Sequence, residues 1–192
     1  FERLHRLERG NDVERHLAAF AVRDVGPARQ QQHGLDLVGR LRAADDIVAD
    51  RALAEFPNGD WADEAHCNRG RALYELGRLD EAQRELSAVA AGQQGLLHVK
   101  AEFTLGRIHV ARKQYDDAVR LFFKVAYGHG GTAAPASFHP WQAEAIFAAA
   151  RVLEEIGRQD SARKLYQELV DSYPTSERTA LARLSLERIL RR

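Results

Sequence analysis

The stretch Leu76-Gly77-Arg78-Leu79-Asp80-Glu81-Ala82 returns twice in altered form, as Lys113-Gln114-Tyr115-Asp116-Asp117-Ala118 and as Ile156-Gly157-Arg158-Gln159-Asp160-Ser161-Ala162. Each copy lies between two segments whose apolar residues recur at three- and four-residue steps, the pattern of amphipathic helices. One such hairpin cannot bury its apolar face alone, so neighbouring hairpins must stack. The sequence therefore predicts an array of helical hairpins, which favours a binding scaffold over an enzyme.

The spacing of the copies gives the length of the repeat. Ala118 follows Ala82 by 36 residues, close to the unit length of common helical repeats, whereas Ala162 follows Ala118 by 44 residues. The additional residues fall in 127–140, which is rich in Gly, Ala and Pro and cannot continue a helix. We expect an inserted loop at 127–140, between the second and third hairpins.

With these alanines at position 20 of a repeat, the chain resembles the tetratricopeptide repeat (TPR) family. The second hairpin matches the family pattern at Leu105, Gly106, Tyr115 and Phe122. The first and third hairpins match at Gly70, Leu73, Gly77, Leu79 and Leu86, and at Leu153, Gly157, Tyr166, Leu169 and Pro174. The pattern's large residue at position 4 is replaced by His66, Glu102 and Ile146, and position 8 of the third repeat is Ala150. The resemblance covers residues 60–192 and implies an all-α superhelix (a TPR solenoid).

The expected organisation is a TPR domain over residues 41–192, with clear repeats at about 60–93, 97–130 and 141–174. An apolar stripe over 41–56 predicts the second helix of a degenerate N-terminal repeat. Residues 1–40 are either its partner helix with a helical cap or a partly disordered segment. Pro174 ends the third repeat and Ser176 offers an N-cap for a capping helix over 177–192, which is alternatively the first helix of a further repeat.

Composition narrows the classes of partner. Lys plus Arg and Asp plus Glu both number 28, so no overall basic field suggests nucleic acid. Cys67 is the single cysteine, which excludes an intrachain disulfide. No segment of the sequence is long and apolar enough to predict a transmembrane helix.

The resemblance implies that the first helix of each hairpin lines a concave groove, chiefly through positions 2, 5, 9, 12 and 13. Position 9 is arginine in all three clear repeats, position 5 is Cys67 followed by two phenylalanines, and position 12 begins with a tyrosine. Guanidinium groups bind carboxylates through two parallel hydrogen bonds. We therefore predict a protein or peptide ligand with carboxylates and apolar side chains, bound by Arg71, Arg107, Arg151, Phe103, Phe147 and Tyr74.

Two alternatives stay open. The groove arginines can instead form ordinary same-helix ion pairs, Arg71 with Glu75 and Arg151 with Glu154 or Glu155, whereas Arg107 has Ala111 at that offset. The phenylalanines can equally pack between hairpins. The second alternative is functional: the array is a structural region of a larger protein that forms homo-oligomers through Leu184, Leu186 and Ile189 and uses no peptide groove.

No motif for catalysis, metal or cofactor binding stands out. The glycine-rich stretch 128–132 lacks the Gly-Lys-Ser/Thr ending of a phosphate loop. His129 and His139 lie near the two ends of the inserted loop, with no acid or cysteine between them to complete a metal site. A mobile loop is therefore a simpler interpretation than a metal site. We expect no catalytic residue, no metal and no cofactor.

Residues 165–176, which end in Tyr-Pro-Thr-Ser, are similar to a bacterial cell-envelope branch of the family. That branch includes the periplasmic Tol-Pal-associated coordinator and the outer-membrane assembly lipoproteins. The resemblance implies a periplasmic or cell-envelope adaptor. The residues themselves leave a cytoplasmic location open.

Overall fold

Helices form almost all of the chain that this computed structural model describes, residues 62–92 and 95–191. The predicted N-terminal segment 1–40 and the predicted helix 41–56 lie outside these residues. The described part contains no strand and seven α-helices: α3 (Ala62–Glu75), α4 (Leu79–Ala91), α5 (Leu96–Ala111), α6 (Tyr115–Tyr127), α7 (His139–Glu155), α8 (Gln159–Ser172) and α9 (Arg178–Leu190). The prediction of an all-α repeat fold is confirmed.

The repeated phrase forms the turn of each hairpin. One residue per turn has a positive φ, Gly77 (77°), Lys113 (60°) and Gly157 (80°), as is common where a helix ends in the left-handed conformation. The next residue then donates its backbone N–H to a carbonyl five positions back, over 2.8 to 2.9 Å: Arg78 to Leu73, Gln114 to His109 and Arg158 to Leu153. The three phrases therefore share one backbone conformation.

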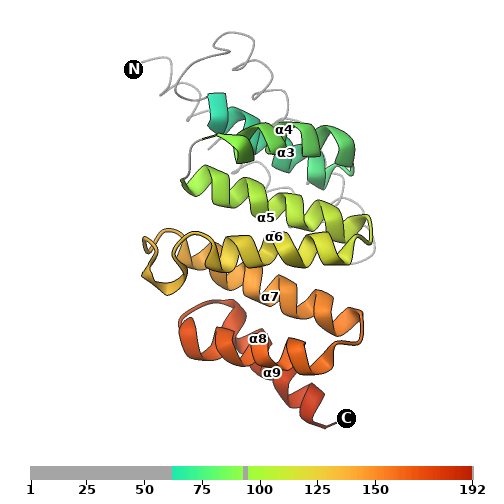
Figure 1. Ribbon diagram of the computed structural model, residues 1–192, viewed down its shortest axis with the longest axis vertical. Helices are drawn as coiled ribbons and strands as arrows, with labels where there is room; N and C mark the ends of the chain where they lie inside the picture. The colour runs from blue at the N-terminus through green and yellow to red at the C-terminus, as the bar shows by residue number, and fades with distance from the viewer. Residues whose placement is uncertain (1–61, 93–94, 192) are drawn as a thin grey trace, which may run out of the picture. The chain divides into compact units, whose positions relative to one another are not determined.

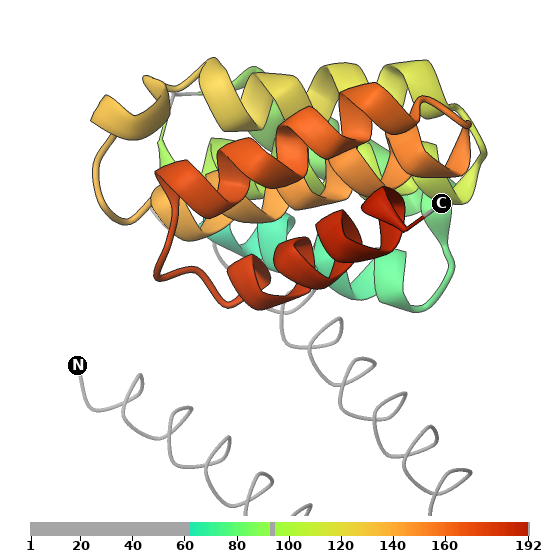
Figure 2. The ribbon, with the colours of Figure 1, turned by 90° about the horizontal axis from the view of Figure 1, so that it is seen from below.

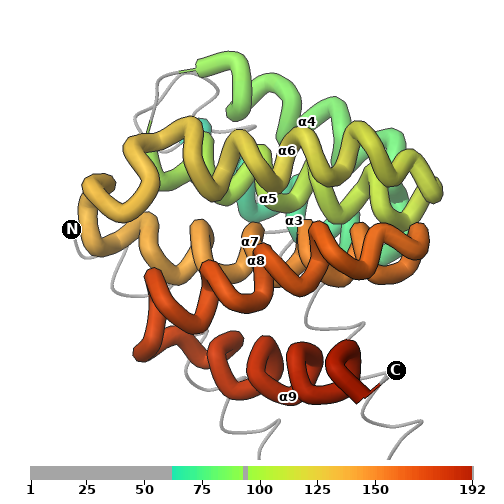
Figure 3. Tube along the Cα trace, turned by 60° about the horizontal axis from the view of Figure 1, so that its bottom comes forward, coloured from blue at the N-terminus to red at the C-terminus, as the bar shows by residue number. Residues whose placement is uncertain are grey.

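Consecutive helices pack on one another in chain order, and the first helices of the hairpins also contact each other, α3 with α5, α5 with α7 and α7 with α9. Figure 1 shows this stack from α3 to α9, and Figure 3 shows the same order in a turned view. Seen from below, α9 lies in the same row as α3, whereas α6 and α8 lie in the other row (Figure 2). The arrangement is a helical solenoid in which α9 takes the place of a fourth first helix.

The core runs along the stack between the two rows of helices. Leu73, Leu86 and Ile108 belong to a cluster near α3, and Phe122 and Tyr166 belong to a larger cluster that reaches α9. Hairpin helices approach closely where position 8 is small. A Cβ built at Gly106 would lie only 2.6 Å from Cε1 of Phe122.

The predicted inserted loop connects α6 to α7 and contains a short 3₁₀ helix, Gly131–Ala133. The imidazole of His129 is buried and lies 2.8 Å from Oε2 of Glu102 on α5. The segment is therefore tied to the solenoid at its start. At the far end of the array, Glu177 and not the predicted Ser176 is the N-cap of α9, although the Oγ of Ser176 accepts the backbone N–H of Arg178 over 3.2 Å.

Candidate functional site

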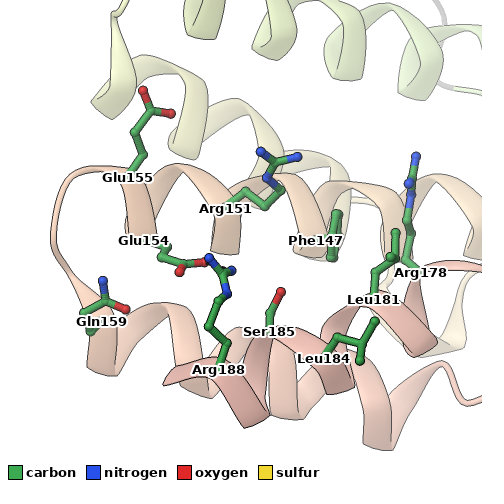
Figure 4. Close-up of a pocket in the computed structure, with 10 residues that line it drawn as sticks. All are labelled: Phe147, Arg151, Glu154, Glu155, Gln159, Arg178, Leu181, Leu184, Ser185 and Arg188. Carbon is green, nitrogen blue, oxygen red and sulfur yellow. Dashed lines mark hydrogen bonds and ion pairs between the residues drawn. The ribbon is translucent and has the colours of Figure 1, made fainter. Parts of the chain in front are cut away.

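Helices α7 and α9 face each other through residues 34 positions apart, one repeat length. The four facing pairs fall on the groove positions 2, 5, 9 and 12: Glu144 with Arg178, Phe147 with Leu181, Arg151 with Ser185, and Glu154 with Arg188. All of these residues except Glu144 line one pocket of about 700 Å³. We call this pocket, which is completed by Glu155, Gln159 and Leu184, the α7–α9 groove (Figure 4).

Ion pairs join the two helices at both ends of this groove. At one end the guanidinium of Arg178 binds Glu144 through two hydrogen bonds, of which Nη2 to Oε1 is 2.7 Å, and it lies 5.4 Å from the centre of the Phe147 ring. The hydrogen bond to Glu144 raises the pKa of Arg178 above its usual value. At the other end Nη2 of Arg188 lies 3.0 Å from Oε2 of Glu154. These two arginines already have carboxylate partners.

Arg151 lies between the two ion pairs and is exposed. The acids that could pair with it on its own helix are engaged elsewhere. Glu154 binds Arg188 and accepts the Tyr166 hydroxyl over 3.2 Å, while Glu155 accepts the Tyr115 hydroxyl over 2.7 Å. In the described part of the chain no carboxylate is within ion-pair distance of Arg151. Its charge is therefore available to a ligand.

Apolar side chains line the same groove as this guanidinium. Leu181 and Leu184 on α9 are 41% and 62% exposed, large fractions for leucine, and both line the α7–α9 groove. Figure 4 shows Leu181 opposite Phe147 and Leu184 further along α9. The groove thus combines a cationic centre with exposed apolar side chains.

A second pocket of about 720 Å³ lies beside the first, between α5, α7 and the connection from α8 to α9. Phe103, Arg107 and Trp141 line it together with residues of the inserted segment, and Arg178 lines both pockets. The ring centres of Phe103 and Trp141 are 5.6 Å apart. The rings of Phe103, Trp141 and Tyr173 line this neighbouring pocket, which we call the aromatic pocket.

The three predicted groove arginines lie in different surroundings. Arg71 is exposed on α3 and forms no ion pair with any described residue. Arg107 has a partner that its own helix could not supply: Nη2 lies 3.2 Å from Oε1 of Glu75, and the guanidinium is 4.4 Å from the centre of the Tyr74 ring. The expected same-helix pair of Arg71 with Glu75 is thus replaced by a pair between neighbouring repeats. Arg151 alone of the three lies in the α7–α9 groove.

Other predicted residues are less accessible than the groove pattern implied. Phe103 and Phe147 are buried and pack against Phe122 and Tyr166, so the packing alternative holds for most of each ring. Cys67, at the same repeat position, is fully buried and is not a groove residue. Burial raises the pKa of its thiol.

The three residues predicted to form homo-oligomers differ in exposure. Leu184 is exposed, whereas Leu186 and Ile189 are partly buried and pack against the core of the solenoid. Sequence reasoning missed Arg178, Leu181 and Arg188 as groove residues. The signal was present, because each stands 34 residues after its partner on α7.

The stacked hairpins and the groove between first helices define a helical-repeat protein. Residues 63–89 and 144–176 each match a family model described as tetratricopeptide repeat. The two matches support a tetratricopeptide repeat protein, a class that generally mediates protein–protein interactions and is typically non-catalytic. No curated protein matches the chain. Among the described residues, no helix is long and apolar enough to cross a membrane.

Proposed function

We propose that the protein is a non-catalytic scaffold whose α7–α9 groove binds a peptide segment bearing a carboxylate next to an apolar side chain. The observation that supports this proposal most strongly is Arg151, an exposed guanidinium without a carboxylate partner in the described residues, located between two arginines that have one. An incoming carboxylate would meet an unpaired charge there.

The surroundings of Arg151 favour a peptide over a small anion. The groove is large enough for several side chains, and Leu181 and Leu184 offer apolar surface that a free anion would not use. The ion pairs from Arg178 to Glu144 and from Arg188 to Glu154 hold both walls in place before a ligand binds. Such preorganisation lowers the entropic cost of binding.

The test begins with selection of short peptides from a random displayed library on the whole chain. We expect the bound peptides to be enriched in Asp or Glu near Leu or Phe. Arg151→Gln should weaken their binding by about 10- to 100-fold, because a hydrogen bond to a charged group contributes about 1.5 to 3 kcal/mol.

Arg163→Gln is the matched control, since Arg163 is an exposed arginine on α8 outside the groove. Binding should be unchanged in this variant. Equal loss in both variants, or no loss in Arg151→Gln, would reject the proposed site.

Self-assembly is the second candidate function, and the exposed leucines of α9 favour it. Leu184 and Leu190 are 62% and 70% exposed. If α9 is an assembly surface, sedimentation velocity of the wild type should show a concentration-dependent dimer that Leu184→Lys abolishes. A monomer at all concentrations would rule this candidate out.

A cell-envelope location stays a prediction from the resemblance of residues 165–176. Fractionation of cells that express the tagged full-length protein tests it directly. Recovery in the cytoplasmic fraction would contradict it.

A further inference from the structure

A second cluster of polar side chains lies away from the groove, where the inserted segment meets α5. His98 and Glu102 are four residues apart on α5 and therefore share one face of the helix. His129 comes from the connection after α6, 27 residues beyond Glu102. Nε2 of His98 lies 2.9 Å from Oε1 of Glu102, and Nε2 of His129 lies 2.8 Å from Oε2.

We propose that His98, Glu102 and His129 form a binding site for a divalent transition-metal ion, with Zn²⁺ as the expected occupant. The three side chains offer two imidazole nitrogens and one carboxylate oxygen, and their ligand atoms all lie within 4.8 Å of one another. Two histidines and one glutamate are a donor set that zinc accepts, with a fourth position left for water. In the described residues no other group of three potential ligands is this close.

Burial distinguishes this cluster from a chance surface grouping. The side chains of His98, Glu102 and His129 are 7%, 2% and 5% exposed. Burial would raise the pKa of the Glu102 carboxyl, but hydrogen bonds from Lys124 and His129 outweigh it and hold the pKa below its usual range.

Lys124 competes with the metal. Its ammonium nitrogen lies 2.5 Å from Oε1 of Glu102 and neutralises the carboxylate when no ion is bound. The Lys124 side chain is 56% exposed, so it can move into solvent when a cation takes its place. Removing this ammonium should strengthen metal binding, whereas it would weaken a purely structural cluster.

The hydrogen-bond partners of the histidine ligands determine the expected affinity for the metal ion. Histidine ligands usually donate their second ring N–H to an acceptor, and loss of that partner lowers metal affinity about 10- to 100-fold. Nδ1 of His98 is buried and has no hydrogen-bond partner in the described part of the chain. We therefore expect weaker binding than at a structural zinc site with all four ligands from the protein.

An ion at this site would join α5 to the inserted segment. Ala136, His139 and Trp141, which follow His129, line the aromatic pocket beside the groove. Metal binding should thus reduce the motion of one wall of that pocket. This inference rests on the cluster alone and does not depend on the proposed peptide function.

The test is titration of the whole chain with Co²⁺, followed by absorption spectroscopy, and with Zn²⁺, followed by calorimetry. The chain has eight histidines, so a matched control is needed. His109→Gln changes a histidine on α5 that contacts Gln114 instead of this cluster, and it should leave binding intact. His129→Gln should abolish the strongest site and its Co²⁺ absorption bands.

Lys124→Met should tighten Zn²⁺ binding at least about tenfold, because an ammonium in contact with the ligand carboxylate is removed. A gain of affinity cannot result from misfolding, so this variant keeps the test decisive if His129→Gln unfolds. Equal binding by His129→Gln and His109→Gln, or no gain in Lys124→Met, would overturn the proposal.

Discussion

Substitution of Gly106 by alanine tests the packing that defines each hairpin. The added Cβ would lie 2.6, 2.9 and 3.2 Å from three carbons of the Phe122 ring. That ring is buried and packs against Phe103, with ring centres 5.6 Å apart, so it cannot move away freely. Overpacking of this kind costs about 1 to 3 kcal/mol. Alanine recovers about 0.5 to 1 kcal/mol because it favours a helix interior.

We therefore expect Gly106→Ala to lower the free energy of unfolding by about 1 kcal/mol, and by no more than about 2.5 kcal/mol, measured by urea unfolding followed by circular dichroism. Phe122→Leu removes the ring edge that the new methyl group meets. The loss of unfolding free energy in the double variant should thus be smaller, by at least about 0.5 kcal/mol, than the sum of the losses in the two single variants. Strict additivity, or a stabilised Gly106→Ala, would show that the two helices are not in this close contact.

Three further predictions concern a turn, a buried thiol and a buried acid. Of the three hairpin-turn residues with a positive φ, Lys113 is the one that is not glycine. Lys113→Gly should therefore raise the free energy of unfolding by about 1 kcal/mol, and Gly157→Ala should lower it by a similar amount in the same urea assay. Cys67 is fully buried with a raised pKa, so a disulfide reagent should label it at least about 100-fold more slowly than the thiol introduced by Leu184→Cys; similar rates would contradict its burial. The pKa of Glu102 is lowered in the folded state, so its ionisation stabilises the fold above the usual value of 4.5, and this contribution is lost as the pH falls through the folded pKa. The stability advantage of the wild type over Glu102→Gln should therefore shrink as the pH falls below 4.5 in urea unfolding at several pH values, and an advantage that grows there would contradict a lowered pKa.

The hairpins could be predicted because their signals are local. The turn phrase contains both the residue with positive φ and the start of the next helix, and the alanine spacing places Gly106 opposite Phe122. The inserted segment was visible for the same reason, since Gly and Pro interrupt a helical pattern within a few residues.

The partners of the charged side chains could not be predicted in this way. Arg107 pairs with Glu75 of the neighbouring repeat. Glu102 contacts His129 only because the segment after α6 folds back onto α5. For the groove arginines, same-helix spacing identified the nearest acids in sequence, but the acid that Arg107 contacts lies on the neighbouring first helix. Only the 34-residue register could have indicated that Arg188 would take Glu154 and leave Arg151 unpaired.

The location of a bound peptide tests the central claim most directly. Leu184 and Leu190 are both exposed on α9, but Leu184 lines the α7–α9 groove and Leu190 does not. Because the natural cysteine is buried, Leu184→Cys and Leu190→Cys can each be labelled with a benzophenone photocrosslinker. Crosslinking of a selected acidic peptide from the position of Leu184, and not from that of Leu190, is the predicted result. Equal crosslinking from both positions, or crosslinking from that of Leu190 alone, would contradict a peptide-binding groove between α7 and α9.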